Sequence, residues 1–268
     1  MVRDLTGSVI AITGASSGIG AATAIACAEA GMDVALAARR EDRMYEIAGR
    51  IEGLGRRSLV VLCDVDRDED VHQFIDRTLH EFARLDVVFA NAGYGLRASI
   101  MDTTDEQARM IFETNFFGSL RLIRACVPVM REKGRGHILI CSSVVSEIGL
   151  PMHGMYSATK AAQDAIAGSL RAELAVEGLN VSSVHPVGTR TEFFEKMRRR
   201  GARTHDRKTN TPSTMMQSPQ KVARSIVRCL RRPKPEVWPQ PLARLGLALT
   251  TAWPTLSAMS MRYMMRRQ

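Results

Sequence analysis

The sequence has no paired-cysteine motif. Its five cysteines are scattered along the chain and none forms a CxxC pair, which excludes the spacing of a disulfide framework or a zinc site. The hydrophobic stretch of a signal peptide is missing before the first apolar run, and there is no internal repeat or low-complexity tract. These absences predict a cytoplasmic protein with reduced thiols. With 268 residues, 45% of them hydrophobic, the chain is long enough for one large core.

Acidic residues are scarce in the C-terminal part of the chain. From Lys196 to Gln268 there are 17 Lys and Arg against 2 Asp and Glu, whereas the net charge of the whole chain is +9. A strongly basic region is a feature of nucleic-acid-binding proteins. No recognised nucleic-acid module and no basic sheet with interleaved aromatic residues accompanies it here. We therefore predict no nucleic-acid partner.

The end of the chain combines this positive charge with an uncharged stretch. Residues 245–261 carry no charged side chain but include five Ser or Thr and one Pro, which is marginal for a transmembrane helix. Arginines lie on both sides of the stretch, so peripheral contact with an anionic membrane is one interpretation. A dimer contact and a cover over a pocket remain equally open.

Short apolar runs alternate with longer segments of helical composition. The expected strands are 8–13, 33–38, 58–63, 86–91, 136–143 and 180–186, and the expected helices are one ending near residue 31 and those at 41–54, 67–83, 104–131 and 154–177. Apolar runs of this kind suit strands buried on both faces. The alternation predicts a Rossmann-like α/β fold, a doubly wound parallel sheet in a single domain.

We place the dinucleotide-binding and catalytic domain at residues 1–240, with a substrate lid at about 191–219 and a C-terminal extension at 241–268. The segment EVWPQ at 236–240 suits a final edge strand, because proline is tolerated at sheet edges.

The stretch TGASSGIG joins the first strand to the first helix. Gly14 permits a sharp turn at the strand end, Gly18 permits close approach of a phosphate, and Gly20 permits the helix to pack on the strand. Backbone N–H groups and the dipole at a helix start attract anions, so the turn predicts a dinucleotide pyrophosphate site. Its other expected contacts are Ser16, Ser17 and Ile19. For the glycines alone, a tight turn without a ligand is the alternative.

Tyr156 and Lys160 are four residues apart, which places their side chains on one face of a helix. A tyrosine phenol has an ordinary pKa of about 10, and a neighbouring ammonium group lowers that pKa. We expect Tyr156 to protonate a carbonyl oxygen in reduction, or to accept the alcohol proton in oxidation. On spacing alone, an ordinary Tyr–Lys pair on a helix surface is the alternative.

Several motifs occur in a fixed order: TGASSGIG, then Asn91, Ala92 and Gly93, then Asn115, Ser143 and YSATK at 156–160. In this combination the chain resembles the short-chain dehydrogenase/reductase family over roughly residues 6–195. The resemblance implies that Lys160 also holds the nicotinamide ribose. It further implies that Asn115 holds a water that extends a proton relay from the lysine to solvent.

A serine at the end of the fifth strand completes the predicted catalytic group. Strand ends line the ligand crevice of such a sheet, and a hydroxyl there can hydrogen-bond the substrate oxygen where negative charge develops. The family spacing favours Ser143. Ser142 is the alternative for this hydrogen bond; it lies one residue earlier and faces the other way.

The prediction of the cofactor depends on two arginines. The second strand ends in Ala38, Arg39 and Arg40, where an acidic residue would mark NAD. A guanidinium suits the 2′-phosphate of NADP, so we predict NADP(H) in preference to NAD(H); the start of a solvated helix is the alternative. The resemblance adds these cofactor contacts: Asp64, Val65, Asn91, Ala92, Gly93, Tyr156, Lys160, Pro186, Thr189 and Thr191.

The predicted lid mixes apolar and basic residues. Phe193, Phe194 and Met197 favour a hydrophobic substrate, whereas the basic run would meet an acidic group or remain a solvated loop. We therefore predict an NADP-dependent oxidoreductase that interconverts a carbonyl and an alcohol on a lipophilic small molecule. A non-catalytic NADP-binding sensor or scaffold, and an epimerase or dehydratase, are the alternatives. The resemblance implies a homodimer or homotetramer that pairs through the helices at 104–131 and 154–177.

Overall fold

A computed structural model describes residues 2–194, 197, 216–253, 255, 258, 259 and 262. The strands are β1 (Val9–Thr13), β2 (Asp33–Ala38), β3 (Ser58–Leu62), β4 (Val87–Ala90), β5 (Gly136–Cys141), β6 (Leu179–Val184) and β7 (Glu236–Val237). The helices are α1 (Gly18–Glu29), α2 (Glu41–Glu52), α3 (Asp68–Phe82), α4 (Asp105–Phe112), α5 (Gly118–Glu132), α6 (Gly154–Ala175), α8 (Pro219–Arg231) and α9 (Pro241–Ala252), with a π-helical turn η1 (Glu113–Phe117) and a 3-10 turn η2 (Val144–Ser146).

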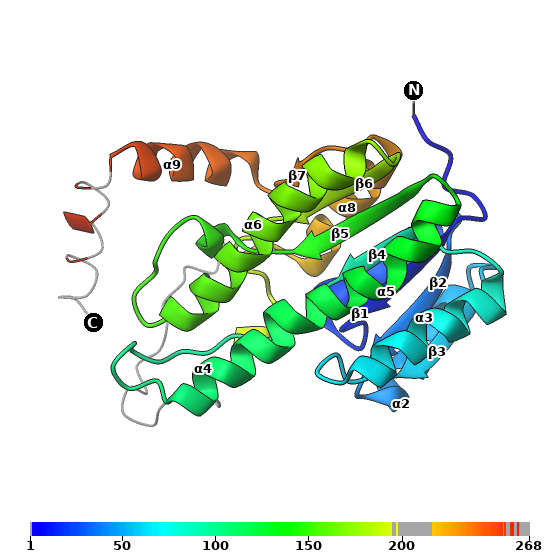
Figure 1. The fold of residues 1–268 in the computed structure, drawn as a ribbon, viewed down its shortest axis with the longest axis horizontal. Coiled ribbons are helices and arrows are strands. Elements are labelled where there is room, and N and C mark those ends of the chain that lie inside the picture. The colour runs from blue at the N-terminus through cyan, green and yellow to red at the C-terminus, as the bar shows by residue number, and fades with distance from the viewer. Residues whose placement is uncertain are drawn as a thin grey trace.

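The strands form one parallel sheet in the order β3-β2-β1-β4-β5-β6-β7. The order reverses between β1 and β4, so the helices that follow these strands cover opposite faces and leave a crevice at the carboxyl ends. Figure 1 shows α3, α5 and α6 side by side over one face, with α8 behind the sheet. The predicted Rossmann-like doubly wound sheet is confirmed.

Alternation along each strand divides the core into two layers. Ile10 and Ile12 of β1 pack in the layer that contains residues of α1, α2 and α8. Val9 and Ala11 of the same strand pack in the layer that contains residues of α3, α5 and α6. Successive strand residues point to opposite faces, so a strand buried on both sides is apolar at consecutive positions, as Val9, Ile10, Ala11 and Ile12 are.

Two elements differ from the sequence expectation, and a third agrees with it. The helix expected at 104–131 is divided by η1, which places a wider turn around Asn115. No helix was expected over α8, although Val222, Ile226 and Leu230 of this helix are buried at intervals of four residues. β7 occupies the edge of the sheet beside β6, where the EVWPQ segment was expected.

All five cysteines are buried and unpaired, as expected from their spacing. Burial raises the pKa of the Cys27 thiol to about 12. It also raises the pKa of the Cys63 thiol to about 12, with smaller contributions from Asp70 and Asp64. These thiols are protonated at neutral pH.

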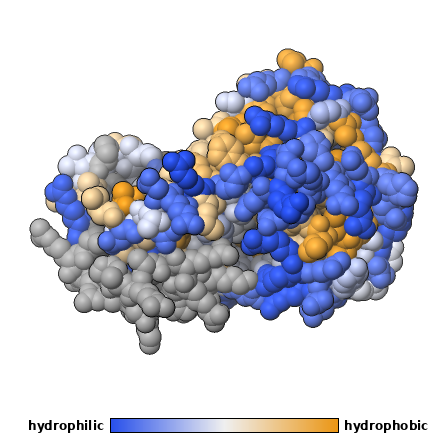
Figure 2. Space-filling view, turned by 60° about the horizontal axis from the view of Figure 1, so that its bottom comes forward, coloured by the Kyte–Doolittle hydropathy of each residue, from blue (hydrophilic) through white to orange (hydrophobic). Residues whose placement is uncertain are grey.

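Helix α9 has several apolar side chains exposed to solvent. Figure 1 shows it extending from the body of the molecule toward the C-terminus. Leu242, Leu245 and Leu249 are all more than half exposed. The face of the molecule shown in Figure 2 is largely hydrophilic, and its hydrophobic residues gather in limited patches. In the part of the chain that the structure describes, no helix combines the length and apolar character needed to cross a membrane.

Candidate active site

A cavity of about 630 Å³ opens at the carboxyl ends of the strands. It brings together most of the residues that sequence analysis selected. Its lining includes Gly14, Ser16, Ser17, Gly18, Ile19, Arg39, Arg40, Asp64, Val65, Asn91, Ala92, Gly93, Ser143, Tyr156, Lys160, Pro186, Thr189 and Thr191. Of the site residues predicted from the sequence, Gly20 and Asn115 do not line the cavity.

The glycine turn is built for close backbone approach. Gly14 has φ +67°, and a Cβ at this position would lie 2.8 Å from the Cα of Ala92. A Cβ at Gly20 would lie 2.5 Å from the carbonyl oxygen of Gly14. α1 begins at Gly18, so its N-terminal N–H groups border the cavity. The turn therefore fits the pyrophosphate of a dinucleotide.

Asn91 holds the turn to the neighbouring strand. Its Nδ2 donates to the carbonyl oxygens of Thr13 at 3.0 Å and Gly14 at 3.3 Å. The hydroxyl of Thr13 accepts from the backbone N–H groups of Asn91 and Ala92. This network fixes β1 against β4 at the point where the sheet order reverses.

The two predicted cofactor arginines have different surroundings. Arg40 donates to the hydroxyl of Ser17 at 2.7 Å and to that of Ser16 at 3.1 Å, and it pairs with Glu192 at 2.9 Å. Arg39 is 59% exposed and forms an ion pair with Asp64 at 3.5 Å. Arg40 is thus the arginine fixed at the glycine turn.

Tyr156 lies on α6 at the other end of the cavity. Burial raises the pKa of its phenol, the Cys141 thiol raises it further, and a hydrogen bond with Ser143 lowers it. The lowering that we expected from Lys160 is not the net effect in this structure. The Lys160 ammonium lies 5.6 Å from the centre of the Tyr156 ring and is turned toward other partners.

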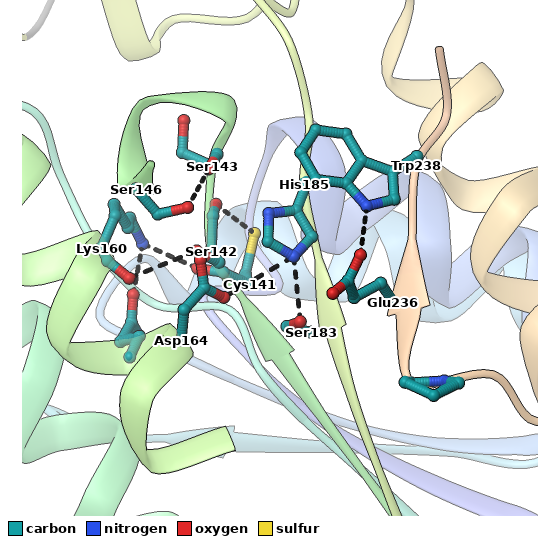
Figure 3. Close-up of polar contacts among 12 residues, drawn as sticks. Cys141, Ser142, Ser143, Ser146, Lys160, Asp164, Ser183, His185, Glu236 and Trp238 are labelled. Carbon is teal, nitrogen blue, oxygen red and sulfur yellow. Dashed lines mark hydrogen bonds and ion pairs between the residues drawn. The ribbon is translucent and has the colours of Figure 1, made fainter. Parts of the chain in front are cut away.

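Lys160 is 4% exposed, and its ammonium group bonds two acceptors in the interior. Its Nζ donates to the carbonyl oxygen of Cys141 at 2.7 Å and to Oε1 of Gln163 at 2.8 Å. Burial lowers the pKa of this lysine, whereas Cys141 and Asp164 raise it. Figure 3 shows Lys160 beside Cys141, the last residue of β5.

The two candidate serines point in different directions. Ser143 contacts the Tyr156 phenol, and its carbonyl oxygen accepts from the Ser146 hydroxyl at 2.7 Å. The hydroxyl of Ser142 donates to the backbone carbonyl of Lys160 at 3.3 Å. This arrangement favours Ser143 as the serine beside the reacting oxygen, because the Ser142 hydroxyl is used to hold α6 to β5.

Asn115 is fully buried in η1. Its side chain exchanges hydrogen bonds with the backbone of Tyr94, at 2.9 Å in both directions, and donates to the Thr159 hydroxyl at 3.1 Å. Its backbone carbonyl accepts from Gln163 and Ser119. Asn115 therefore links η1 to α6 through direct protein contacts.

The segment after β6 closes the other side of the cavity. The carbonyl of Pro186 accepts from the N–H of Val144, and the Thr189 hydroxyl donates to the carbonyl of Val187. Gln217, which sequence analysis missed, pairs with Thr189 as a short parallel bridge and donates to Thr189 and Val187 through its side chain. Thr191 contacts the glycine turn, since a Cβ at Gly18 would lie 3.1 Å from its methyl group.

Apolar side chains lie over Tyr156. The Phe193 and Tyr156 rings are 5.5 Å apart between centres, and Met197 is 1% exposed. A Cβ at Gly95 would meet both Phe193 and Met197 at less than 3 Å. Residues 195–196 and 198–215, which make up most of the predicted lid, lie outside the described residues.

A polar cluster behind the cavity was not predicted. Figure 3 shows His185, directly after β6, with a dashed contact to Asp164 and another to Ser183. Its Nε2 lies 2.9 Å from the Ser183 hydroxyl and 3.6 Å from Asp164, and its ring stacks on Trp238 at 4.2 Å. These contacts hold β7 and α6 to the strand that leads into Pro186.

The fold and this constellation of glycine turn, serine, tyrosine and lysine define a nucleotide-dependent oxidoreductase of the doubly wound type. The family model described as short chain dehydrogenase matches residues 8–201. The chain belongs to the short-chain dehydrogenase/reductase family.

Individual relatives agree with this assignment. A dehydrogenase/reductase SDR family protein 7-like protein of Drosophila melanogaster is 33% identical over 88% of this chain and 73% of its own length. An 11-beta-hydroxysteroid dehydrogenase A of Arachis hypogaea is 38% identical over 69% of this chain and 53% of its own length.

Solved structures show the same fold. A short chain dehydrogenase/reductase from Burkholderia phymatum, in complex with NAD, has a TM-score of 0.84 at 22% identity and covers 95% of this chain and 96% of its own. An alcohol dehydrogenase from the archaeon Thermococcus sibiricus, complexed with 5-hydroxy-NADP, has a TM-score of 0.73 at 30% identity and covers 83% and 89%. Structural neighbours thus bind NAD or NADP.

Proposed function

We propose that this protein is an NADP(H)-dependent oxidoreductase that interconverts a carbonyl and an alcohol on a lipophilic small molecule. The observation that carries the proposal is the single cavity in which Tyr156, Ser143 and Lys160 lie at one end and the glycine turn with Arg40 at the other. The length of a dinucleotide would connect these two ends. A bound nicotinamide would supply or accept the hydride.

The protein side chains supply the proton and the orientation. Tyr156 donates its phenolic proton to the carbonyl oxygen in reduction and accepts a proton from the alcohol in oxidation. Ser143 donates a hydrogen bond to the same oxygen as negative charge develops on it. Lys160 keeps a positive charge near Tyr156, which favours the phenolate when the proton has left.

Arg40 supports the preference for NADP. The side chain joins Ser16 and Ser17 at the turn where the adenosine phosphate would lie, and a guanidinium binds phosphate through paired, charge-assisted hydrogen bonds. The carboxylate of Glu192 bonds the same guanidinium and Arg43. A 2′-phosphate would compete with this carboxylate for the guanidinium of Arg40.

The apolar side chains near Tyr156 support a lipophilic substrate. Phe193, Phe194 and Met197 line the catalytic end of the cavity together with Leu150 and Val145. Apolar lining with a few polar groups is typical of sites for small hydrophobic ligands. The hydroxysteroid dehydrogenase named above is a relative with a substrate of this chemical class.

A fluorescence titration of the protein with NADPH, and separately with NADH, tests the cofactor. We expect tight binding of NADPH and much weaker binding of NADH. Turnover of a panel of lipophilic ketones and aldehydes by the wild type and by Tyr156→Phe then tests the chemistry. Full activity of Tyr156→Phe, or binding of neither cofactor, would contradict the proposal.

We further propose that the protein is cytoplasmic and contacts membranes peripherally through residues 241–268. The exposed leucines of α9 and the arginines of this region support the proposal. Sedimentation with anionic liposomes should fall when these residues are deleted. Equal sedimentation of both forms would contradict it. The family resemblance supports a homodimer or homotetramer, which the molar mass in solution would test.

A further inference from the structure

Gln163 completes the surroundings of the lysine. It lies three residues after Lys160 on α6 and is 0% exposed. Its Oε1 accepts from the Lys160 ammonium at 2.8 Å. Because an ammonium group only donates hydrogen bonds, the amide must present its oxygen to Lys160 and its nitrogen to the other side.

The amide nitrogen of Gln163 is equally well placed. Nε2 donates to the backbone carbonyl of Asn115 at 2.7 Å and to the hydroxyl of Ser119 at 2.7 Å. Ser119 in turn donates to the same carbonyl at 2.8 Å. Both protons of the amide are thus used, and the side chain joins Lys160 directly to η1.

The Gln163 side chain thus connects Lys160 to Asn115. The family resemblance assigns that contact to a water held by Asn115. A carboxamide accepts a hydrogen bond from an ammonium group and donates one to a carbonyl, but it has no titratable proton near neutral pH to pass on. It therefore holds the charge of Lys160 in place without serving as a proton carrier.

We propose that Gln163 is a positioning residue that fixes where the Lys160 ammonium lies relative to Tyr156 and ties it to Asn115, in the place of the water expected from the resemblance. The inference rests on the proposed function, because it concerns how Lys160 acts on Tyr156 in that reaction.

Other titratable groups also face the lysine and would affect any titration. Cys141 lies at the end of β5, and Tyr156 and Asp164 lie on α6. His185, after β6, lies 3.6 Å from Asp164. The experiment must therefore isolate the signal of Tyr156 from these groups.

Ultraviolet titration of ionised tyrosine provides that signal, because the chain has four tyrosines and Tyr156→Phe gives the background to subtract. In Gln163→Glu a carboxylate would offset the Lys160 charge, so we expect the apparent pKa of Tyr156 to rise by about one unit. The pH midpoint of kcat should move by the same amount. Gln163→Met keeps the volume but removes the acceptor, and we expect kcat to fall about tenfold or more through misplacement of Lys160.

Ser119→Ala is the matched control. It removes one partner of the Gln163 amide but leaves the contact with Lys160, so it should lower the Tm while the Tyr156 titration stays as in the wild type. The proposal is overturned if Gln163→Glu and Gln163→Met lower the Tm but titrate like the wild type. If Gln163→Met does not fold, the titration of the near-isosteric Gln163→Glu decides alone. A wild type that turns over no carbonyl would refute the proposed function, whereas the tyrosine titration would still decide this inference.

Discussion

Gly20→Ala is the substitution whose effect follows most directly from the geometry. A Cβ at Gly20 would lie 2.5 Å from the carbonyl oxygen of Gly14 and 2.7 Å from Nδ2 of Asn91. Neither the backbone of the turn nor an asparagine held by two carbonyls can move away freely. The added methyl group therefore pushes α1 from the end of β1. Overpacking of this kind costs about 1–3 kcal/mol.

The same substitution at Gly49 provides the control. Gly49 is an exposed position on α2, and a Cβ there would have no neighbour within 4 Å. Alanine at such a helix position is more stable than glycine by roughly 0.5–1 kcal/mol. In a domain of this size, a change of about 1 kcal/mol in the free energy of unfolding shifts the Tm by about 2–4 °C. We therefore expect a lower Tm for Gly20→Ala and a slightly higher Tm for Gly49→Ala.

Thermal unfolding and NADPH fluorescence, measured on both variants, check the argument. Gly20→Ala should also weaken NADPH binding at least tenfold, which corresponds to about 1.4 kcal/mol, because the phosphate turn moves with the helix. Gly49→Ala should bind NADPH as the wild type does. A Gly20→Ala variant with wild-type Tm and affinity would refute the claim that the turn depends on this close contact.

Three further substitutions test separate parts of the molecule. Tyr156→Phe should keep NADPH affinity and lower kcat by about 10²–10⁴-fold, the usual contribution of a general acid; wild-type turnover would exclude the role. Arg40→Ala should weaken NADPH binding by about 10–100-fold through loss of a charge-assisted contact, with NADH binding unchanged; an equal loss for both cofactors would contradict the phosphate assignment. Burial lowers the pKa of His137 to about 3, so its neutral form stabilises the fold above about pH 6.5, and this stability is lost as the pH falls toward 3. His137→Gln should therefore flatten the decline of the unfolding free energy in this range by up to about 1.4 kcal/mol per pH unit, and an unchanged slope in urea titrations would count against it.

Most of the sheet could be predicted because β1 to β5 are mainly apolar runs, each with a helix after it. β2 was expected at 33–38 and is found at Asp33–Ala38. The turn η1 was not predictable in the same way, because ETNFF has no local signal for a wider helical turn. α8 was not predicted, although its apolar residues have helical spacing between its basic residues.

The residues of the site were found by motif, but their contacts were not. Gln163 lies 48 residues from Asn115 in sequence, and only the packing of α6 on η1 brings the two together. Glu192 meets Arg40 across 152 residues, so the competition for this arginine has no local sequence signal. The sign of the Tyr156 pKa shift was also wrong in expectation, because burial outweighs the lysine when the ammonium is turned away.

Alkylation of the buried thiols would measure unfolding of the core. Cys27 and Cys126 are fully buried in the core, and a thiol whose pKa is raised by such burial reacts slowly with electrophiles. Alkylation in the native state would then proceed only as fast as each layer of the core opens. Cys27 packs with the α1 layer and Cys126 with the α5 layer, so their separate labelling rates would measure how independently the two sides of the sheet open.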